Sequence, residues 1–134
     1  MKAPSRWTVA AADLVCVLVF AAIGRASHGE EVGLGGVWTT AWPFAAGWLL
    51  GWALVLLVPG ARARPLGVLA GVVVWVPTVV VGMLLRVASG AGVETSFVVV
   101  ATVVLGVFLL GWRGVAALVR RRRVPRETGD PARV

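Results

Sequence analysis

Four long apolar stretches, separated by short segments that hold most of the charged residues, dominate this sequence of 134 residues. The stretches cover residues 7–24, 39–58, 66–85 and 95–112. A membrane-spanning helix needs about 20 mostly apolar residues to cross the hydrocarbon core of a bilayer, and each stretch is close to that length. We therefore expect an all-α fold, an integral membrane four-helix transmembrane bundle over residues 1–115, followed by a basic, partly disordered cytoplasmic tail over residues 116–134.

The distribution of positive charge predicts how these helices are oriented. Eleven of the thirteen Lys and Arg residues fall before the first stretch, in the segment 59–65 or after the fourth stretch, leaving only Arg25 and Arg86 on the other side. By the positive-inside rule, both termini are expected in the cytoplasm. Arginine outnumbers lysine twelve to one beside abundant Ala, Val and Gly, a bias typical of GC-rich bacterial genomes, so we expect a bacterial cytoplasmic membrane.

The first stretch has a second interpretation as a cleaved signal peptide. Lys2 and Arg6 precede a short apolar run that is followed by small residues such as Gly24, which is the order found in signal peptides. We favour a membrane span because the run that begins at Trp7 is long enough to cross the bilayer and ends at an arginine.

The composition argues against several classes of function. A net charge of +7 would suggest nucleic-acid binding in a soluble protein, but membrane topology accounts for the basic residues here, so no nucleic-acid partner is expected. One histidine and one cysteine, Cys16, are too few for a zinc site, which takes three or four protein ligands. No nucleophile and base can be paired, so we expect no enzyme activity, no metal and no cofactor.

Asp13 is the one acidic residue inside an apolar stretch. An aspartate at the centre of a membrane helix costs about 2.5–3.5 kcal/mol on insertion scales, so it must be paired, protonated or hydrated. One interpretation is a structural salt bridge with Arg6 or with Arg113, which lies at the cytoplasmic end of the fourth stretch. The other is a functional carboxylate that carries a proton or a cation across the membrane.

A second polar group is expected on the outer side. Arg25 and His28 are three residues apart and would share a helix face, Glu30 and Glu31 follow, and Arg86 ends the third stretch on the same side. Such a group could bind an anion or relay protons, because histidine titrates near neutral pH. The simpler interpretation is that these residues are solvated helix ends.

Small residues at four-residue spacing predict close packing between helices. Gly47 and Gly51 form such a pair in the second stretch, and Gly67 and Gly71 form one at the start of the third. In lipid, pairs of this kind let helix backbones approach one another. The partner could be another helix of the same chain or a second copy of the chain, so a homodimer is possible.

Aromatic and proline residues in the middle stretches suggest a pocket. The candidate lining residues are Trp42, Pro43, Phe44 and Trp75. Pro77 is expected to kink the third helix, and a kinked helix can line a cavity. Trp48, Trp52 and Trp75 lie deep in their stretches, where each indole N–H needs an acceptor, although filling the core is the more usual role of such residues.

The run Arg120 to Arg123 lies at the end of an apparent helical extension after Trp112 and has two compatible roles. It holds the C-terminus in the cytoplasm, and it can attract anionic lipid at about 1 kcal/mol per arginine.

Several segments recur in the order of a known family. They are Asp13 with IGRASH at 23–28, TAWPFAAGWLLGW at 40–52, VWVPTVVVGMLLR at 74–86, SFVVVA at 96–101 and LLGWR at 109–113. Together they resemble domain-of-unknown-function family 3054, small four-span membrane proteins of actinobacteria and archaea, over about residues 8–115. The resemblance implies an integral membrane protein and supplies no activity. The positions that match the family are Asp13, Gly24, Arg25, His28, Trp42, Pro43, Phe44, Gly47, Trp75, Gly82, Arg86, Phe97, Trp112 and Arg113.

Two functional hypotheses follow from these residues. The first is a small, dimeric, proton- or ion-linked transporter centred on Asp13, with Arg113 or the outer group of Arg25, His28 and Arg86 taking part. The second is a non-catalytic accessory or scaffold protein that binds lipid or a partner membrane protein, in which Asp13 serves only as an internal salt bridge.

Overall fold

The computed structural model describes residues 4–123, and its described part is built entirely from helices and their connections. The helices are α1 (Arg6–Ser27), α2 (Leu34–Leu57), α3 (Pro59–Ala63), α4 (Val68–Ala88) and α5 (Thr95–Arg123). Four of them, α1, α2, α4 and α5, are long and apolar enough to cross a membrane. The expected all-α bundle of four candidate membrane helices is therefore confirmed.

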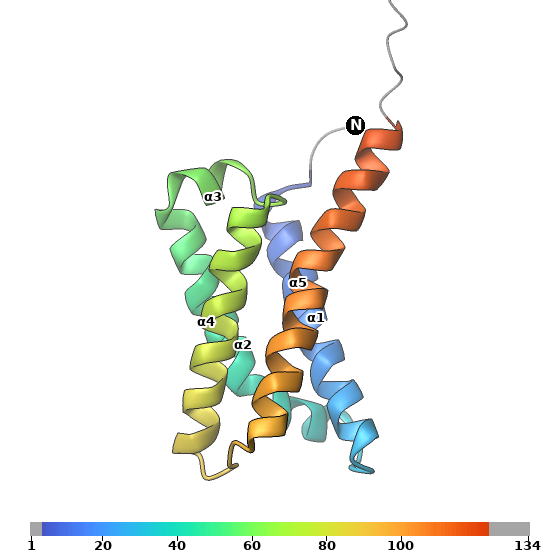
Figure 1. Cartoon of the computed structure of the whole chain (residues 1–134), viewed down its shortest axis with the longest axis vertical. Helices are drawn as coiled ribbons and strands as arrows, with labels where there is room; N and C mark the ends of the chain where they lie inside the picture. The colour runs from blue at the N-terminus through green and yellow to red at the C-terminus, as the bar shows by residue number, and fades with distance from the viewer. Residues whose placement is uncertain (1–3, 124–134) are drawn as a thin grey trace, which may run out of the picture.

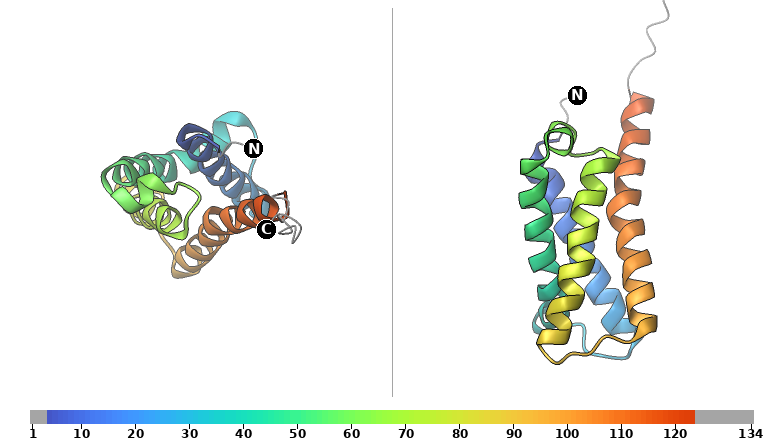
Figure 2. Two further views of the ribbon diagram at one scale, coloured as in Figure 1. Left: turned by 90° about the horizontal axis from the view of Figure 1, so that it is seen from above. Right: turned by 60° about the vertical axis from the view of Figure 1, so that its left-hand side comes forward.

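The four long helices run alternately up and down and enclose a common core. Viewed along the bundle, neighbouring helices follow the cyclic order α1, α2, α4, α5 (Figure 2). The start of α1, the short helix α3 and the end of α5 lie together at one end (Figure 1), which we call the α3 end. The connections from α1 to α2 and from α4 to α5 lie at the opposite end.

Local sequence explains where the helices begin and stop. The hydroxyl of Ser5 caps α1 by accepting a hydrogen bond from the backbone N–H of Thr8 at 3.2 Å. After α1 and α4 the chain turns at Gly29 and Gly90, whose φ angles of 69° and 78° favour glycine. The segment 59–65 contains the short helix α3, whose first turn holds Pro59, where a missing N–H costs nothing.

Helix α5 is longer than the fourth apolar stretch. It continues from Trp112 to Arg123 and projects past the other helices at the α3 end (Figure 1). Residues 116–123, which we assigned to the basic tail, are thus helical in the structure, and residues 124–134 of that tail lie outside the described residues. We call residues 113–123 the α5 extension.

The glycine pairs form close contacts between helices of the same chain. A Cβ atom on Gly47 would lie 2.5 Å from the carbonyl oxygen of Pro77 and 2.7 Å from the Cα of Thr78, so α2 and α4 touch backbone to backbone. A Cβ on Gly51 would lie 2.9 Å from the Cα of Val74. Gly71 likewise faces side chains of α5. A homodimer would therefore need a surface other than these glycine faces.

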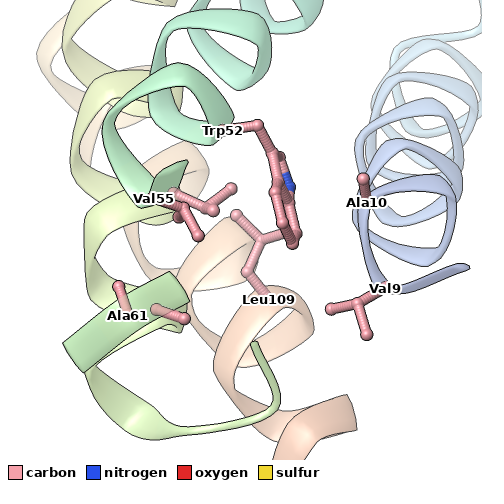
Figure 3. Packing of buried hydrophobic residues seen from close by; sticks show 8 residues of the cluster. Val9, Ala10, Trp52, Val55, Ala61 and Leu109 are labelled. Carbon is pink, nitrogen blue, oxygen red and sulfur yellow. The ribbon is translucent and has the colours of Figure 1, made fainter. Parts of the chain in front are cut away.

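The buried residues form two clusters, one in each half of the bundle. The cluster at the α3 end contains Val9, Ala10, Trp52, Val55, Ala61, Ala70, Val74 and Leu109 (Figure 3). The other cluster contains Val17, Phe20, Phe44, Ala101 and Leu105. Outside the core, large apolar side chains such as Leu57, Val68 and Leu84 are exposed at 76%, 74% and 64%. An apolar exterior of this kind is what a lipid-facing bundle requires.

Candidate functional site

Asp13 lies in a closed polar cluster between three helices. It is two turns inside α1, its side chain is 0% exposed, and Arg113 of α5, which is 2% exposed, reaches it. The Arg113 Nη1 atom donates to Asp13 Oδ1 at 2.6 Å, and Nη2 donates to Oδ2 at 2.8 Å. This is a bidentate ion pair, the geometry in which an arginine and a carboxylate bind each other most strongly.

Two indoles complete the hydrogen bonding of the Asp13 carboxylate. Trp52 of α2 donates from Nε1 to Oδ2 at 3.0 Å, and Trp112 of α5 donates from Nε1 to Oδ1 at 2.8 Å. Each carboxylate oxygen thus accepts two hydrogen bonds. Figure 3 shows the Trp52 ring lying between α2 and α1, beside Leu109. We refer to Asp13, Trp52, Trp112 and Arg113 as the Asp13–Arg113 cluster.

Arg113 also holds the connection that leads into α4. Its Nε atom donates to the carbonyl oxygen of Pro65 at 3.1 Å, and Nη1 donates to the carbonyl oxygen of Leu109 at 2.8 Å. The guanidinium therefore ties α5 both to α1 and to the segment between α3 and α4. A buried charge costs several kcal/mol unless it is paired and hydrogen-bonded, and both charges of this cluster meet that condition.

The cluster lies near the α3 end of the bundle and not at its centre. Asp13 is seven residues from the first residue of α1, which corresponds to about 10 Å along the helix axis. Pro65, whose carbonyl caps the cluster, belongs to the connection at the α3 end. The charges are thus buried just below one face of the bundle.

The sequence suggested two partners for Asp13, and the structure places only one of them there. Arg113 binds Asp13, whereas Arg6 is exposed at the start of α1. Sequence reasoning missed Trp52 and Trp112 as ligands of the carboxylate. The available signal was that a deep indole needs an acceptor and that Asp13 is the one acid inside a spanning stretch.

Arg25, at the opposite end of the bundle, makes three polar contacts through Nε and Nη1. Its Nε atom donates to the carbonyl oxygen of Glu31 at 2.6 Å, and Nη1 donates to the hydroxyl of Thr40 at 3.0 Å. Nη1 also lies 3.1 Å from a carboxylate oxygen of Glu30. These contacts hold the connection between α1 and α2 against both helices. His28 caps the end of α1 and its side chain is exposed.

Arg86, in the last turn of α4, has a different environment. Its guanidinium carbon lies 4.3 Å from the centre of the Phe97 ring of α5, a cation–π contact. Its Nε atom is buried and has no hydrogen-bond partner within residues 4–123. Glu30 lies within electrostatic range of Arg86. The three residues expected to form one outer group therefore have different surroundings. Arg25 makes polar contacts with the α1–α2 connection and α2, and the side chain of His28 is exposed. Arg86 stacks on Phe97 and has a donor without a partner within residues 4–123.

The four candidate pocket residues have these surroundings in the structure. Phe44 is 0% exposed, contacts the Phe20 ring edge-on at 5.3 Å between ring centres, and leaves no room for a side chain on Gly82. Trp75 is half-buried and donates from Nε1 to the carbonyl oxygen of Thr102 at 3.1 Å. Pro43 is buried and Trp42 is half-buried. Phe44 and Trp75 thus fill space between helices.

An apolar groove adjoins the Asp13–Arg113 cluster. It has a volume of ≈ 570 Å³ and opens between the α5 extension, the segment just before α1 and the connection between α3 and α4. Its lining includes Pro4, Leu66, Trp112, Val115, Val119 and Arg120. Trp112 therefore faces the groove and also donates to Asp13. Elsewhere in residues 4–123, no three His, Cys, Asp or Glu side chains gather as a metal site would require.

Comparison with known proteins gives a family. No curated protein and no solved structure matches the chain. Residues 10–116, which run from the second turn of α1 into the α5 extension and so include most of all four candidate membrane helices, match the family described as "Protein of unknown function (DUF3054)". This match covers most of the chain and includes Asp13, Trp52, Trp112 and Arg113, so the chain belongs to the DUF3054 family.

Proposed function

We propose that this protein is a non-catalytic membrane accessory protein, in which the Asp13–Arg113 cluster locks the helices together and the α5 extension binds anionic lipid. The observation that carries the proposal is the engagement of Asp13, which is 0% exposed and accepts two hydrogen bonds on each oxygen. A carboxylate that carries a proton or a cation must reach water or its cargo at some stage. A carboxylate held by four donors is better suited to fixing the positions of α1, α2 and α5.

The α5 extension supports the lipid-binding part of the proposal. Val115, Leu118 and Val119 are 63%, 51% and 42% exposed, and Arg120 to Arg122 follow them on the same projecting helix. Apolar and basic side chains side by side are typical of helices that lie at the surface of an anionic membrane. Arg120 also lines the end of the apolar groove, where an acyl chain and a phosphate could bind together.

Proton- or ion-linked transport is the second candidate. It is favoured by the position of Trp112, which lines the groove and donates to Asp13, so that one side chain separates the carboxylate from an open surface. Transport would require the bidentate pair between Asp13 and Arg113 to open during each cycle. A proton or a cation would then replace the guanidinium at the carboxylate.

Proteoliposomes distinguish the two functions. We would impose a potassium diffusion potential and follow proton uptake with an internal pH dye, comparing the native protein, Asp13→Asn and protein-free vesicles. The accessory function predicts equal uptake in all three. Uptake that requires the native protein and disappears in a correctly folded Asp13→Asn variant would establish transport and refute the accessory function.

Lipid binding is measured separately in nanodiscs that contain brominated phosphatidylglycerol, a quencher of nearby indoles such as Trp112. Replacing Arg120, Arg121 and Arg122 by glutamine should reduce quenching by the anionic lipid. Replacing Arg62 and Arg64, which are exposed at the same end but outside the groove, is the matched control and should reduce it less. Equal quenching in all three proteins would contradict the assigned lipid site.

A further inference from the structure

Arg86 retains unused hydrogen-bonding capacity in a place where water is scarce. A guanidinium carries five N–H donors, and none of them has an acceptor within residues 4–123. The Nε atom is buried, so solvent does not supply the missing acceptor there. Buried donors without a partner are rare in folded proteins, and each calls for a ligand, an ion or an ordered water.

The Phe97 ring positions this guanidinium without occupying its edge. The guanidinium carbon lies 4.3 Å from the ring centre, which holds the positive charge over the Phe97 ring. Nη1 and Nη2 are not among the buried unpartnered atoms of residues 4–123, so the Nη1–Nη2 edge is the part of the guanidinium that a ligand can reach. This fork matches two oxygens of a phosphate or a carboxylate.

Among the residues that the structure describes, the nearby charges leave Arg86 as the free cation of this end. Arg25 pairs with the carboxylate of Glu30 at 3.1 Å, which largely compensates its positive charge. It also donates to the backbone carbonyl of Glu31 and to the hydroxyl of Thr40. Glu30 lies within electrostatic range of Arg86 but makes no hydrogen bond with it. Glu31 and Glu94 are exposed to solvent, which screens their charges.

We infer that Arg86, stacked on Phe97, forms a binding site for a phosphate-class anion at the end of the bundle opposite the Asp13–Arg113 cluster. The last turn of a spanning helix lies at the level of lipid headgroups, so the anion is either the phosphate of an outer-leaflet phospholipid or a soluble phosphate. Both sources present the same oxygens to the Nη1–Nη2 edge. The site is independent of the α5 extension and of transport.

The test uses the full chain in detergent that contains no phosphate or phospholipid, with Arg120, Arg121 and Arg122 replaced by glutamine in every protein compared, so that the lipid site proposed on the α5 extension does not contribute. The protein that keeps Arg86 in this background is the native reference. Inorganic phosphate and a short-chain phosphatidylglycerol are added in separate titrations, and binding is followed by phosphorus NMR line broadening. The native protein should show saturable binding, and Arg86→Gln should bind about 10- to 100-fold more weakly, since charge-assisted hydrogen bonds are lost. Binding of phosphate alone identifies a soluble ligand, whereas binding of only phosphatidylglycerol identifies a lipid headgroup site.

Two further variants keep the inference falsifiable. Arg62→Gln removes an exposed arginine at the other end of the bundle and should bind like the native protein. Arg86→Lys keeps the charge but loses the fork, so it should bind more weakly than the native protein even if Arg86→Gln does not fold. Equal binding by the native protein and Arg86→Lys, or no saturable binding of either ligand, would overturn the site.

Discussion

Removing both charges of the Asp13–Arg113 pair should destabilise the protein no more than removing either charge alone. Asp13→Asn leaves the Arg113 guanidinium without its counter-ion, and Arg113→Gln leaves a carboxylate that is 0% exposed without its cation. Breaking a buried ion pair in this way costs about 3–5 kcal/mol, because one uncompensated charge stays buried. We expect losses of that size in the free energy of unfolding for each single variant.

The double variant Asp13→Leu with Arg113→Met leaves no buried charge. Apolar side chains of similar size often replace a buried ion pair at little cost. The remaining loss comes from the indole N–H groups of Trp52 and Trp112, which lose their acceptor at about 1–3 kcal/mol each. We therefore expect the double variant to lose no more stability than either single variant, which corresponds to a coupling energy of about 3 kcal/mol.

The free energy of unfolding is measured by titrating the protein in mixed micelles with sodium dodecyl sulfate and following tryptophan fluorescence. Arg6→Gln is the matched control, because Arg6 was the other predicted partner of Asp13 and is exposed in the structure; its effect should stay within about 0.5 kcal/mol. If the two single losses simply add up in the double variant to within about 0.5 kcal/mol, Asp13 and Arg113 do not act as one unit and our reasoning is wrong.

Two substitutions test the contacts between helices in the same titration. Gly47→Ala should lower the free energy of unfolding by about 1–3 kcal/mol, because its Cβ would lie 2.5 Å from the carbonyl oxygen of Pro77. Gly111→Ala has open space around it and should raise the free energy of unfolding by up to about 1 kcal/mol, as in any exposed helix. A change of the same sign in both variants would contradict this packing. Trp48→Phe should lose about 0.5–1.5 kcal/mol, since it removes the hydrogen bond from Nε1 to the carbonyl oxygen of Ala10. Trp38→Phe, at a position 57% exposed, should change stability by less than about 0.5 kcal/mol, and a larger effect there would argue against our assignment of the loss to the hydrogen bond.

The number of helices and their approximate places were predictable because the bilayer sets one length for every span. The hydrocarbon thickness requires about 20 apolar residues, and that requirement is visible in any window of the sequence. The extension of α5 past Trp112 was also indicated, since Arg120 to Arg123 are good helix formers whose polarity ends the apolar signal without ending the helix. Apolar length therefore predicted the membrane spans, and the helix-forming residues after Trp112 indicated that the last helix continues beyond its span.

The contents of the buried cluster were only partly predictable. The cost of a carboxylate in lipid predicted that Asp13 has a partner, and Arg113 was one of two arginines within reach. Choosing between Arg113 and Arg6, or finding Trp52, requires the relative rotation of three helices, which depends on how their side chains interlock. The glycine pairs show the same limit, because spacing predicts a close contact but not whether the partner is α4 or a second chain.

The hydrophobic effect does not drive helices together in lipid, so each pair of neighbouring helices in this bundle needs another kind of contact. Helices α2 and α4 approach through Gly47 and Gly51, where backbone contact replaces side-chain packing. The other three neighbouring pairs are joined by indole donors, α2 to α1, α4 to α5 and α5 to α1. These donors are Trp48, Trp52, Trp75 and Trp112.

This division explains why Asp13 is placed where three helices meet. One carboxylate accepts donors from α2 and from α5, so a single buried charge fixes two of the four interfaces at once. Arg113 then extends the same network to the segment before α4 through the carbonyl of Pro65. A chain with only four spans has little interior in which to bury a specific contact, and a shared acceptor sets the rotation and height of several helices with one residue.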